Sequence, residues 1–297
     1  VQASWVGIAG NSILALLKIM AGLLAGSLAV LGDGIDSASD VVTYILTLLT
    51  ARIMSRPPTV KFPYGFKRAD TLAATALAFV IFFAGLQLAI TSIEKLFSNE
   101  TAAIPGKLAI IVTGISIIGK LALSLYQFKK GKALGSSMLT ANAKNMRNDV
   151  VISIGVLIGL GITYATGIAY IDQIIALIVS FWIFKVAYGI FKETNAELMD
   201  GLSDPSIYHK IFEIIKETKG ATNPHRARIR KLGDMYVVAL DVEVHPDLSV
   251  SEAHEIATKI ERQIKSSIGN IYDVMVHVEP LGNDQGDEKF GISENNV

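Results

Sequence analysis

Six long apolar segments fill the chain up to about residue 195, and each is long enough to cross a lipid bilayer, which takes about 20 helical residues. The hydrophobic fraction of 51% and the mean hydropathy of +0.45 are both high for a water-soluble protein. We therefore predict a domain of six transmembrane helices within residues 1–200. The segments lie at 5–28, 32–54, 70–96, 106–128, 139–164 and 168–191.

Basic residues are concentrated in the loops on one side of these segments, whereas the loops near 26–32, 97–106 and 164–168 carry only Glu100. An excess of lysine and arginine marks cytoplasmic loops. The basic loops are therefore predicted to be cytoplasmic and, because the number of spans is even, so are both termini. Their basic residues are Arg52, Arg56, Lys61, Lys67 and Arg68 after the second segment, and Lys129, Lys130 and Lys132 after the fourth.

After Asp200 the composition becomes that of a soluble domain, which we place at 201–282. Two segments are typical of amphipathic helices, DPSIYHKIFEIIKETKG and SVSEAHEIATKIERQIKSSIG, the second capped by Ser249 or Ser251. The segments RARIRKL, DMYVVALDVEVHP and YDVMVHVEP are typical of strands. The order αββαβ predicts a small sheet with helices on one face. The polar residues 283–297 are predicted to be a disordered tail.

Two pairs of oxygen-bearing side chains interrupt the apolar segments: Asp36 and Asp40 in the second, and Asn145 and Asp149 in the fifth. The members of each pair are four residues apart, so on a helix they lie on one face, one turn from each other. Two helices that each present such a pair can form a four-ligand cage for a divalent cation. The alternative is that all four are ordinary solvated residues at helix ends.

Carboxylates inside a bilayer are unfavourable. Each costs about 2.5–3.5 kcal/mol on insertion scales, so these three cost roughly 8–10 kcal/mol before any pairing. A bound cation or protons would offset that cost. Lys18 in the first segment and Lys120 in the fourth either line the same cavity or extend toward the membrane surface, as long lysine side chains do.

Several classes of function are disfavoured by what the sequence lacks. The formal net charge of +0 argues against broad nucleic-acid binding. The absence of cysteine excludes disulfides and thiolate metal sites. No GxxxxGK[ST] motif occurs, so nucleotide-driven pumping has no support. We find no nucleophile–base pair or open catalytic metal site, and we do not expect an enzyme.

The motifs DxxxD and [H/D/N]xxxD, six spans and a cytoplasmic αββαβ domain together resemble the cation diffusion facilitator family. The stretches GNSILALLKIMAGLLAGSLAVLGDGIDSASD and KFPYGFKRAD extend the resemblance over nearly the whole chain. It implies a homodimer, which we expect in a prokaryotic cytoplasmic membrane, that exports a divalent cation in exchange for protons. It assigns the transported metal to Asp36, Asp40, Asn145 and Asp149.

Asn145 departs from the pattern of the zinc members of that family, whose fifth span carries the motif HxxxD with a histidine at this position. A site made of oxygen donors suits a harder ion, above all Mn²⁺, while Fe²⁺ and Zn²⁺ stay as alternatives. An octahedral ion needs more than four side-chain donors. Asp33 and Asn142, one turn before the motif residues, are therefore auxiliary candidates, and the alternative for both is helix capping or packing.

By the same resemblance the soluble domain binds a regulatory divalent metal near a dimer interface. His277 and Glu279 are two apart and so face the same side of the last strand, and Asp241 lies on the polar face of the middle strand. The alternative is a set of surface residues on a small polar-faced sheet. The positions that match the family's ligands are His225, Asp241, His254, His277 and Glu279.

In the basic loop, some members of the family look to hold a further zinc ion through histidines. The matching positions of this chain are Phe62 and Phe66, so we expect no metal there. Arg68 in this loop is expected to pair with an acid such as Asp200, and the alternative is contact with lipid headgroups.

Two functions of other classes are left open. A membrane-anchored metal sensor would not need acids within the spans, and an ion channel would show no proton dependence.

Overall fold

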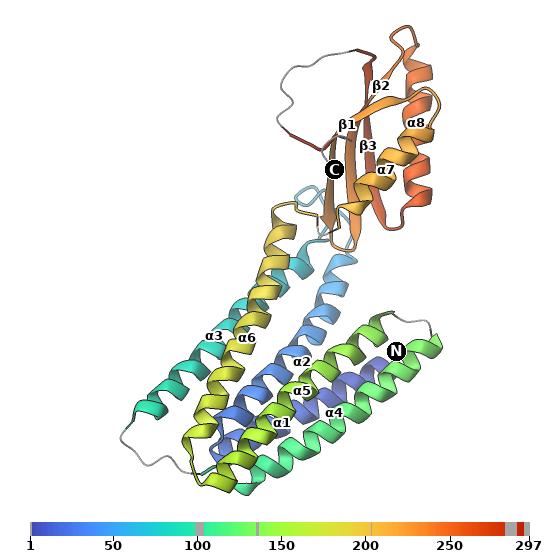
Figure 1. Ribbon diagram of the computed structural model, residues 1–297. Helices are drawn as coiled ribbons and strands as arrows, with labels where there is room; N and C mark the ends of the chain where they lie inside the picture. The colour runs from blue at the N-terminus through green and yellow to red at the C-terminus, as the bar shows by residue number, and fades with distance from the viewer. Residues whose placement is uncertain (1, 99–103, 135–136, 203, 283–289, 294–297) are drawn as a thin grey trace. The chain divides into compact units, whose positions relative to one another are not determined.

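The structure is a computed structural model that describes residues 2–98, 104–134, 137–202, 204–282 and 290–293 (Figure 1). It consists of two compact units. The helical unit comprises Val1–Thr50 and Ala73–Phe191, and the C-terminal unit comprises Ala51–Leu72 and Lys192–Val297. The chain therefore enters the C-terminal unit twice, once around the connection between the second and third helices and once near the end of the sixth.

Six long helices are present, as the apolar segments predict. Five of them are long and apolar enough to cross a membrane, among the residues that the structure describes. The exception is α2, which is long enough at 27 residues but is made less apolar by Asp33, Asp36 and Asp40. The helices are α1 (Gln2–Ala25), α2 (Leu28–Met54), α3 (Ala69–Phe97), α4 (Lys107–Leu134), α5 (Ser137–Thr166) and α6 (Tyr170–Leu198).

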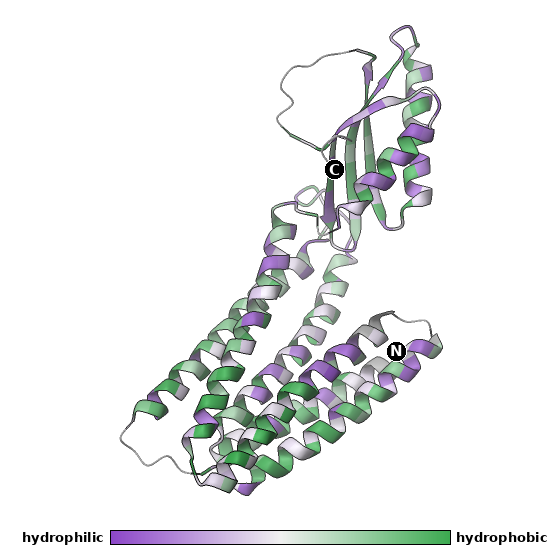
Figure 2. Ribbon diagram, in the orientation of Figure 1, coloured by the Kyte–Doolittle hydropathy of each residue, from purple (hydrophilic) through white to green (hydrophobic). Residues whose placement is uncertain are grey.

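Within the helical unit, α4 and α5 pack side by side and α1 packs against α4 (Figure 1). Hydrophobic residues dominate all of these helices, with hydrophilic positions interrupting them (Figure 2). The apolar core includes Val30 of α2, Leu160 of α5 and Ile183 of α6, each at most 1% exposed. Because the core joins α2, α5 and α6, the motif-bearing helices α2 and α5 are held in one packed bundle.

The start of α2 is capped by an acid from another helix. Asp172 in the first turn of α6 accepts a hydrogen bond from the Leu28 backbone N–H over 2.7 Å and one from the Ser27 hydroxyl over 2.5 Å. The first N–H groups of a helix have no partner within the helix, and a carboxylate there also favours the helix dipole. Asp172 therefore satisfies the buried end of α2.

The C-terminal unit has the predicted order αββαβ: α7 (Ser206–Glu217), β1 (Thr222–Leu232), β2 (Met235–Val244), α8 (Val250–Ser267) and β3 (Ile271–Pro280). The sheet order is β1-β2-β3, with β1 antiparallel and β3 parallel to β2. Gly233, whose φ is 65°, allows the tight turn between β1 and β2. Both α7 and α8 cover one face of the sheet (Figure 1).

The core of this domain lies between the sheet and its two helices. Val238, Leu240 and Val242 of β2 are fully buried there, as the alternating pattern predicts. At the start of α8 the two capping candidates are resolved: the Ser249 side chain accepts from the Glu252 backbone N–H, and the Glu252 carboxylate accepts from the Ser249 backbone N–H. This reciprocal arrangement is a capping box, which fixes the entry of the chain into the helix.

The opposite face of the sheet differs from the prediction. Asp241, expected on a polar face, and Glu243, two residues further along the same strand, are only 2% and 7% exposed. Arg226 contacts Asp241, and Glu243 accepts hydrogen bonds from the Asn223 amide and the Gly282 backbone N–H. A segment of the predicted tail also joins the sheet, because Ile292 pairs with Ala227 of β1 through two backbone hydrogen bonds. Residues 290–293 of the tail are thus described, and the rest of it, 283–289 and 294–297, lies outside the described residues.

Candidate functional site

Both four-residue motifs meet between α2 and α5. Nδ2 of Asn145 donates a hydrogen bond to Oδ1 of Asp40 over 3.1 Å. Asp36 and Asp149 are buried, with 8% and 6% of their surfaces exposed. Asp40 is half-buried and Asn145 is exposed. The hydrogen bond between Asn145 and Asp40 thus joins the two motifs at their accessible end, and Asp36 and Asp149 lie buried on the same two helices.

A lysine from a third helix belongs to this cluster. Nζ of Lys120, in the middle of α4, donates to Oδ2 of Asp149 over 2.6 Å and lies 4.0 Å from Oδ2 of Asp40. It also donates to the Ser37 hydroxyl over 3.1 Å. Lys120 is 1% exposed, so its ammonium group is part of the site and does not extend to the membrane surface.

The second buried lysine is used differently. Nζ of Lys18 on α1 lies 2.8 Å from Oδ2 of Asp33 and 2.8 Å from the Ser153 hydroxyl, and both carboxylate oxygens of Asp33 accept from that hydroxyl. Asp33 and Lys18 are fully buried. These partners give Asp33 the packing role that the sequence left as its alternative. Asn142 lies half-buried on α5, about one turn before Asn145.

The charges of the cluster suit a divalent cation. Lys18 and Asp33 neutralise each other as a fully buried pair. Among the remaining described groups, the ammonium of Lys120 pairs with Asp149 and lies near Asp40, so ionisation of Asp36, Asp40 and Asp149 together would leave two negative charges. Buried charges persist only when they are paired or bind a metal. A divalent cation would make this cluster neutral.

Sequence reasoning left the place of both lysines open because they lie on α1 and α4, far along the chain from the motifs. The spacing of motif residues within a helix predicts which side chains share a face, but it does not predict which neighbouring helix faces them. The available signal was position: each lysine interrupts an apolar span near its middle, where an ionisable residue is a functional candidate.

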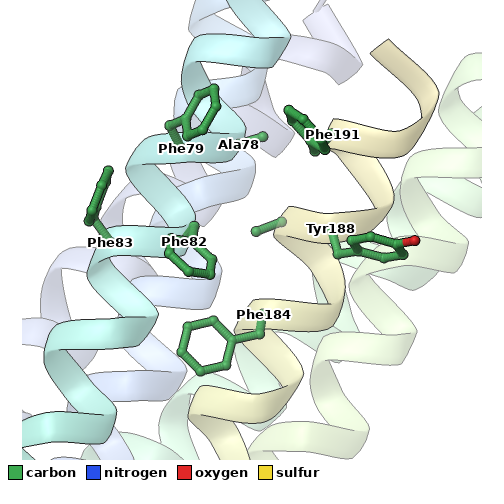
Figure 3. A pocket seen from close by; sticks show the side chains of 8 residues that line it. Ala78, Phe79, Phe82, Phe83, Phe184, Tyr188 and Phe191 are labelled. Atoms are coloured by element: carbon green, nitrogen blue, oxygen red, sulfur yellow. The ribbon is translucent and has the colours of Figure 1, made fainter. Parts of the chain in front are cut away.

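A pocket of about 360 Å³ between α3 and α6 is chemically unlike this cluster (Figure 3). Figure 3 shows its aromatic rings, which come from both helices. None of the described side chains that line it is charged, so it offers nothing to hold a cation. The lining residues are Ala78, Phe79, Phe82, Phe83, Phe184, Ala187, Tyr188 and Phe191.

In the C-terminal unit, three of the five predicted ligands come together. One ligand atom from each of His225, Asp241 and Glu279 lies within 4.8 Å of the other two, and all three residues are buried. Strand register explains this, because His225 pairs with Asp241 across β1 and β2. His277 is exposed and its Nε2 lies 3.4 Å from Oε1 of Glu279, whereas His254 is exposed on α8 and does not join the three-residue cluster.

Arg226, which the sequence did not single out, shares these carboxylates. Its Nη1 lies 2.9 Å from Oδ2 of Asp241 and 3.8 Å from Oε1 of Glu279, and its guanidinium lies 4.7 Å from the ring centroid of Phe290. The cause is irregular backbone: register shifts flank His225, and Arg226 has a φ of 48°. A β-bulge of this kind breaks the alternation from which strand faces are predicted.

The predicted pair of Arg68 and Asp200 is present, and Arg68 also donates to the Leu198 carbonyl over 3.4 Å. Nearby, Lys231 of β1 pairs with Glu197. Partial burial by itself lowers the pKa of Lys231, but the hydrogen bond and the charge of Glu197 outweigh it and hold that pKa above its ordinary value. In the same basic loop, the rings of Phe62 and Phe66 pack with centroids 4.8 Å apart.

Comparison with known proteins agrees with this architecture. The family model for the cation efflux transmembrane domain matches residues 4–199, and the model for the cytoplasmic domain of cation efflux proteins matches residues 203–281. The manganese efflux system protein MneS of Bacillus subtilis (strain 168) is 32% identical over 278 residues, covering 93% of this chain and 94% of that protein. MneP of the same organism, also a manganese efflux system protein, is 27% identical over 288 residues, covering 94% and 95%.

Among solved structures, the metal-bound C-terminal domain of the CzcD transporter from Thermotoga maritima is 41% identical and covers 26% of this chain and 91% of that domain, with a TM-score of 0.26. The two family models together account for nearly all of the chain, and the first alone matches more than half of it. The protein is thus a multi-pass membrane protein of the cation efflux family, the cation diffusion facilitators.

Proposed function

We propose that the protein exports Mn²⁺ from the cytoplasm, holding it between α2 and α5 with Asp36, Asp40, Asn145 and Asp149. The observation that carries this proposal is the 3.1 Å hydrogen bond between Asn145 and Asp40, which joins the two motifs across two helices. The two negative charges left over in the cluster complement a divalent ion. The two manganese efflux relatives, which match over nearly their whole length, support the choice of metal.

The donor chemistry also supports manganese. All four side chains offer oxygen to a cation, and hard oxygen ligands suit Mn²⁺ better than Zn²⁺, which favours imidazole and thiolate. Mn²⁺ is the weakest binder among the first-row divalent ions at a given site, so preference for it must come from ligand type and geometry. Fe²⁺ and Zn²⁺ are the alternatives within the same family.

Export against a gradient requires coupling, and we propose exchange for protons. Carboxylates bind metal when they are deprotonated, so protonation on the outer side favours release of the ion. The emptied site then returns carrying protons instead of bare charge, which a low-dielectric interior would disfavour. Rocking of the helix bundle around a fixed midplane site would expose it alternately to each side.

The C-terminal unit is proposed to dimerise and to bind a regulatory divalent metal. His225, Asp241 and Glu279 are the ligands we propose, because their donor atoms are buried and close together. His254 and His277 are left out of this set because both are exposed. Metal binding there would favour one arrangement of the dimer and so couple to transport, as linkage requires.

The test is flux into proteoliposomes across a series of Mn²⁺, Fe²⁺, Zn²⁺ and Cd²⁺, with internal pH followed at the same time. We expect Mn²⁺ to be transported best, with a pH change that accompanies each metal addition and grows with the imposed proton gradient. Flux that is independent of the proton gradient would identify a channel instead. Absence of flux for every ion would favour the membrane-anchored sensor.

A further inference from the structure

Lys120 contacts the proposed transport site more closely than any sequence motif indicates. Its Nζ lies 2.6 Å from Oδ2 of Asp149 and 4.0 Å from Oδ2 of Asp40, with 1% of the residue exposed. Resting on the proposed function, we propose that the Lys120 ammonium is a built-in competitor of the transported cation. It takes up Asp149 between transport events and is displaced when a metal ion binds.

Competition follows from the geometry of one carboxylate oxygen. A divalent cation binds carboxylate oxygens at about 2.0–2.6 Å, so a cation on Oδ2 of Asp149 would fill the space next to the ammonium. Two positive charges at a single oxygen repel strongly where the surroundings are of low dielectric. The metal therefore gains Oδ2 of Asp149 only if Lys120 gives it up.

Lys120 has a second hydrogen-bond partner that is available when a metal displaces it from Asp149. Its Nζ also donates to the Ser37 hydroxyl over 3.1 Å, and Ser37 follows Asp36 directly on α2. Lys120 thus links α4 to α2 through Ser37 and to α5 through Asp149. Ser37 can keep one hydrogen bond to the ammonium while the metal occupies the carboxylate.

The second buried lysine shows why the role belongs to Lys120. Lys18 is held by Asp33 at 2.8 Å and by Ser153 at 2.8 Å, and it also donates to the Ser37 hydroxyl over 3.2 Å; none of these partners is a motif residue. Lys18 can therefore remain in place throughout transport. Lys120 instead pairs with a proposed metal ligand, so its interaction must change in every cycle.

Two opposite effects should follow from loss of the Lys120 charge. Metal binding should tighten, because the competitor is gone. Turnover should slow, because Asp149 is left without its positive partner when the metal leaves, and an unpaired buried carboxylate is unfavourable. If Lys120 only supported the fold, its removal would weaken metal binding and slow turnover together, instead of tightening binding while turnover slows.

The experiment compares Mn²⁺ transport by the full chain in proteoliposomes for wild type, Lys120→Gln and Lys120→Arg. We expect Lys120→Gln to lower KM for Mn²⁺ about tenfold, equivalent to about 1.4 kcal/mol, and to lower kcat. Lys120→Arg retains the charge and should keep KM close to that of wild type. A KM for Lys120→Gln that is unchanged or higher would overturn the proposal.

Ser37→Ala provides a second test that leaves Lys120 in place and decides the matter if Lys120→Gln does not fold. Without the serine hydroxyl, the ammonium should rest more firmly on Asp149, so KM should rise. A KM that does not rise contradicts the competitor role. The proposed function fails differently, because then wild type itself would not transport Mn²⁺.

Discussion

Asn145 sets the donor chemistry of the proposed transport site. Its Nδ2 is engaged with Oδ1 of Asp40, so the amide can offer a cation only its oxygen. A histidine at this position would replace that oxygen with an imidazole nitrogen, a ligand that Zn²⁺ favours. One side chain thus decides whether the four-donor set is made entirely of oxygen.

Asn145→His should therefore shift the preference from Mn²⁺ toward Zn²⁺. We expect the ratio of kcat/KM for the two ions to change by about tenfold, equivalent to about 1.4 kcal/mol. Competitive uptake of the two metals by proteoliposomes measures this ratio. Asn148→His, at an exposed position of the same helix, is the matched control and should leave the ratio unchanged; equal effects of both variants would place selectivity elsewhere.

At the scale of elements, the approach of α1 to α2 positions the buried end of the site. A Cβ atom built at Gly34 would lie 2.9 Å from the backbone nitrogen of Ile19 and 3.2 Å from Cβ of Lys18. Gly34 thus lets the two backbones meet between Asp33 and Asp36. By contrast, a Cβ at Gly114 of α4 would meet nothing within 4 Å.

Gly34→Ala should force α1 and α2 apart and disturb both Lys18 and Asp36. Overpacking of this kind costs about 1–3 kcal/mol, and transport should fall with it. Thermal unfolding in detergent and Mn²⁺ flux provide the readouts, with Gly114→Ala as the matched control. If the two glycine variants proved equally stable and equally active, the close approach of α1 to α2 at Gly34 would not be needed for transport.

The helix α8 has a pH dependence that can be isolated. Hydrogen bonds from the side chain and backbone of Ser249 hold the pKa of Glu252 below its ordinary value of 4.5. A depressed pKa stabilises the folded state above the ordinary value, and this contribution is lost as pH falls through the folded-state pKa. Glu252→Gln should therefore be less stable than wild type at neutral pH, with the difference shrinking in acid. Melting curves over that range check this; a difference that does not change with pH would contradict it.

How much the sequence predicts differs between these elements. The six spans follow from apolar length, and the αββαβ order follows from alternation and helix signals, because both patterns are local. The contacts of Lys120 and Arg226 are not local. Lys120 depends on which helix packs beside α5, and Arg226 depends on a bulged strand with a φ of 48°. The sequence likewise predicts five ligands in the soluble domain, of which three share the buried cluster.

At the scale of the whole molecule, both proposed metal sites follow one electrostatic rule. In the helical unit Lys120 pairs with Asp149, and in the C-terminal unit Arg226 pairs with Asp241. Each buried carboxylate cluster is thus partly balanced by a basic side chain from the same chain, which reduces the cost of burying it. A metal ion entering either site must share or displace that partner. The metal affinity of both sites therefore depends on how much more favourably the carboxylates bind the metal than the basic side chain.

The most direct test of the transport site is Mn²⁺ uptake by proteoliposomes that contain wild type or Asp149→Asn. Asparagine keeps the size of the side chain but removes the charge that Lys120 and the metal share. Asp204→Asn, which alters an exposed residue of the C-terminal unit, serves as the control. With equal amounts of folded protein, we expect uptake by wild type and Asp204→Asn and its loss in Asp149→Asn. Uptake by Asp149→Asn at the wild-type rate would contradict binding of the cation between α2 and α5.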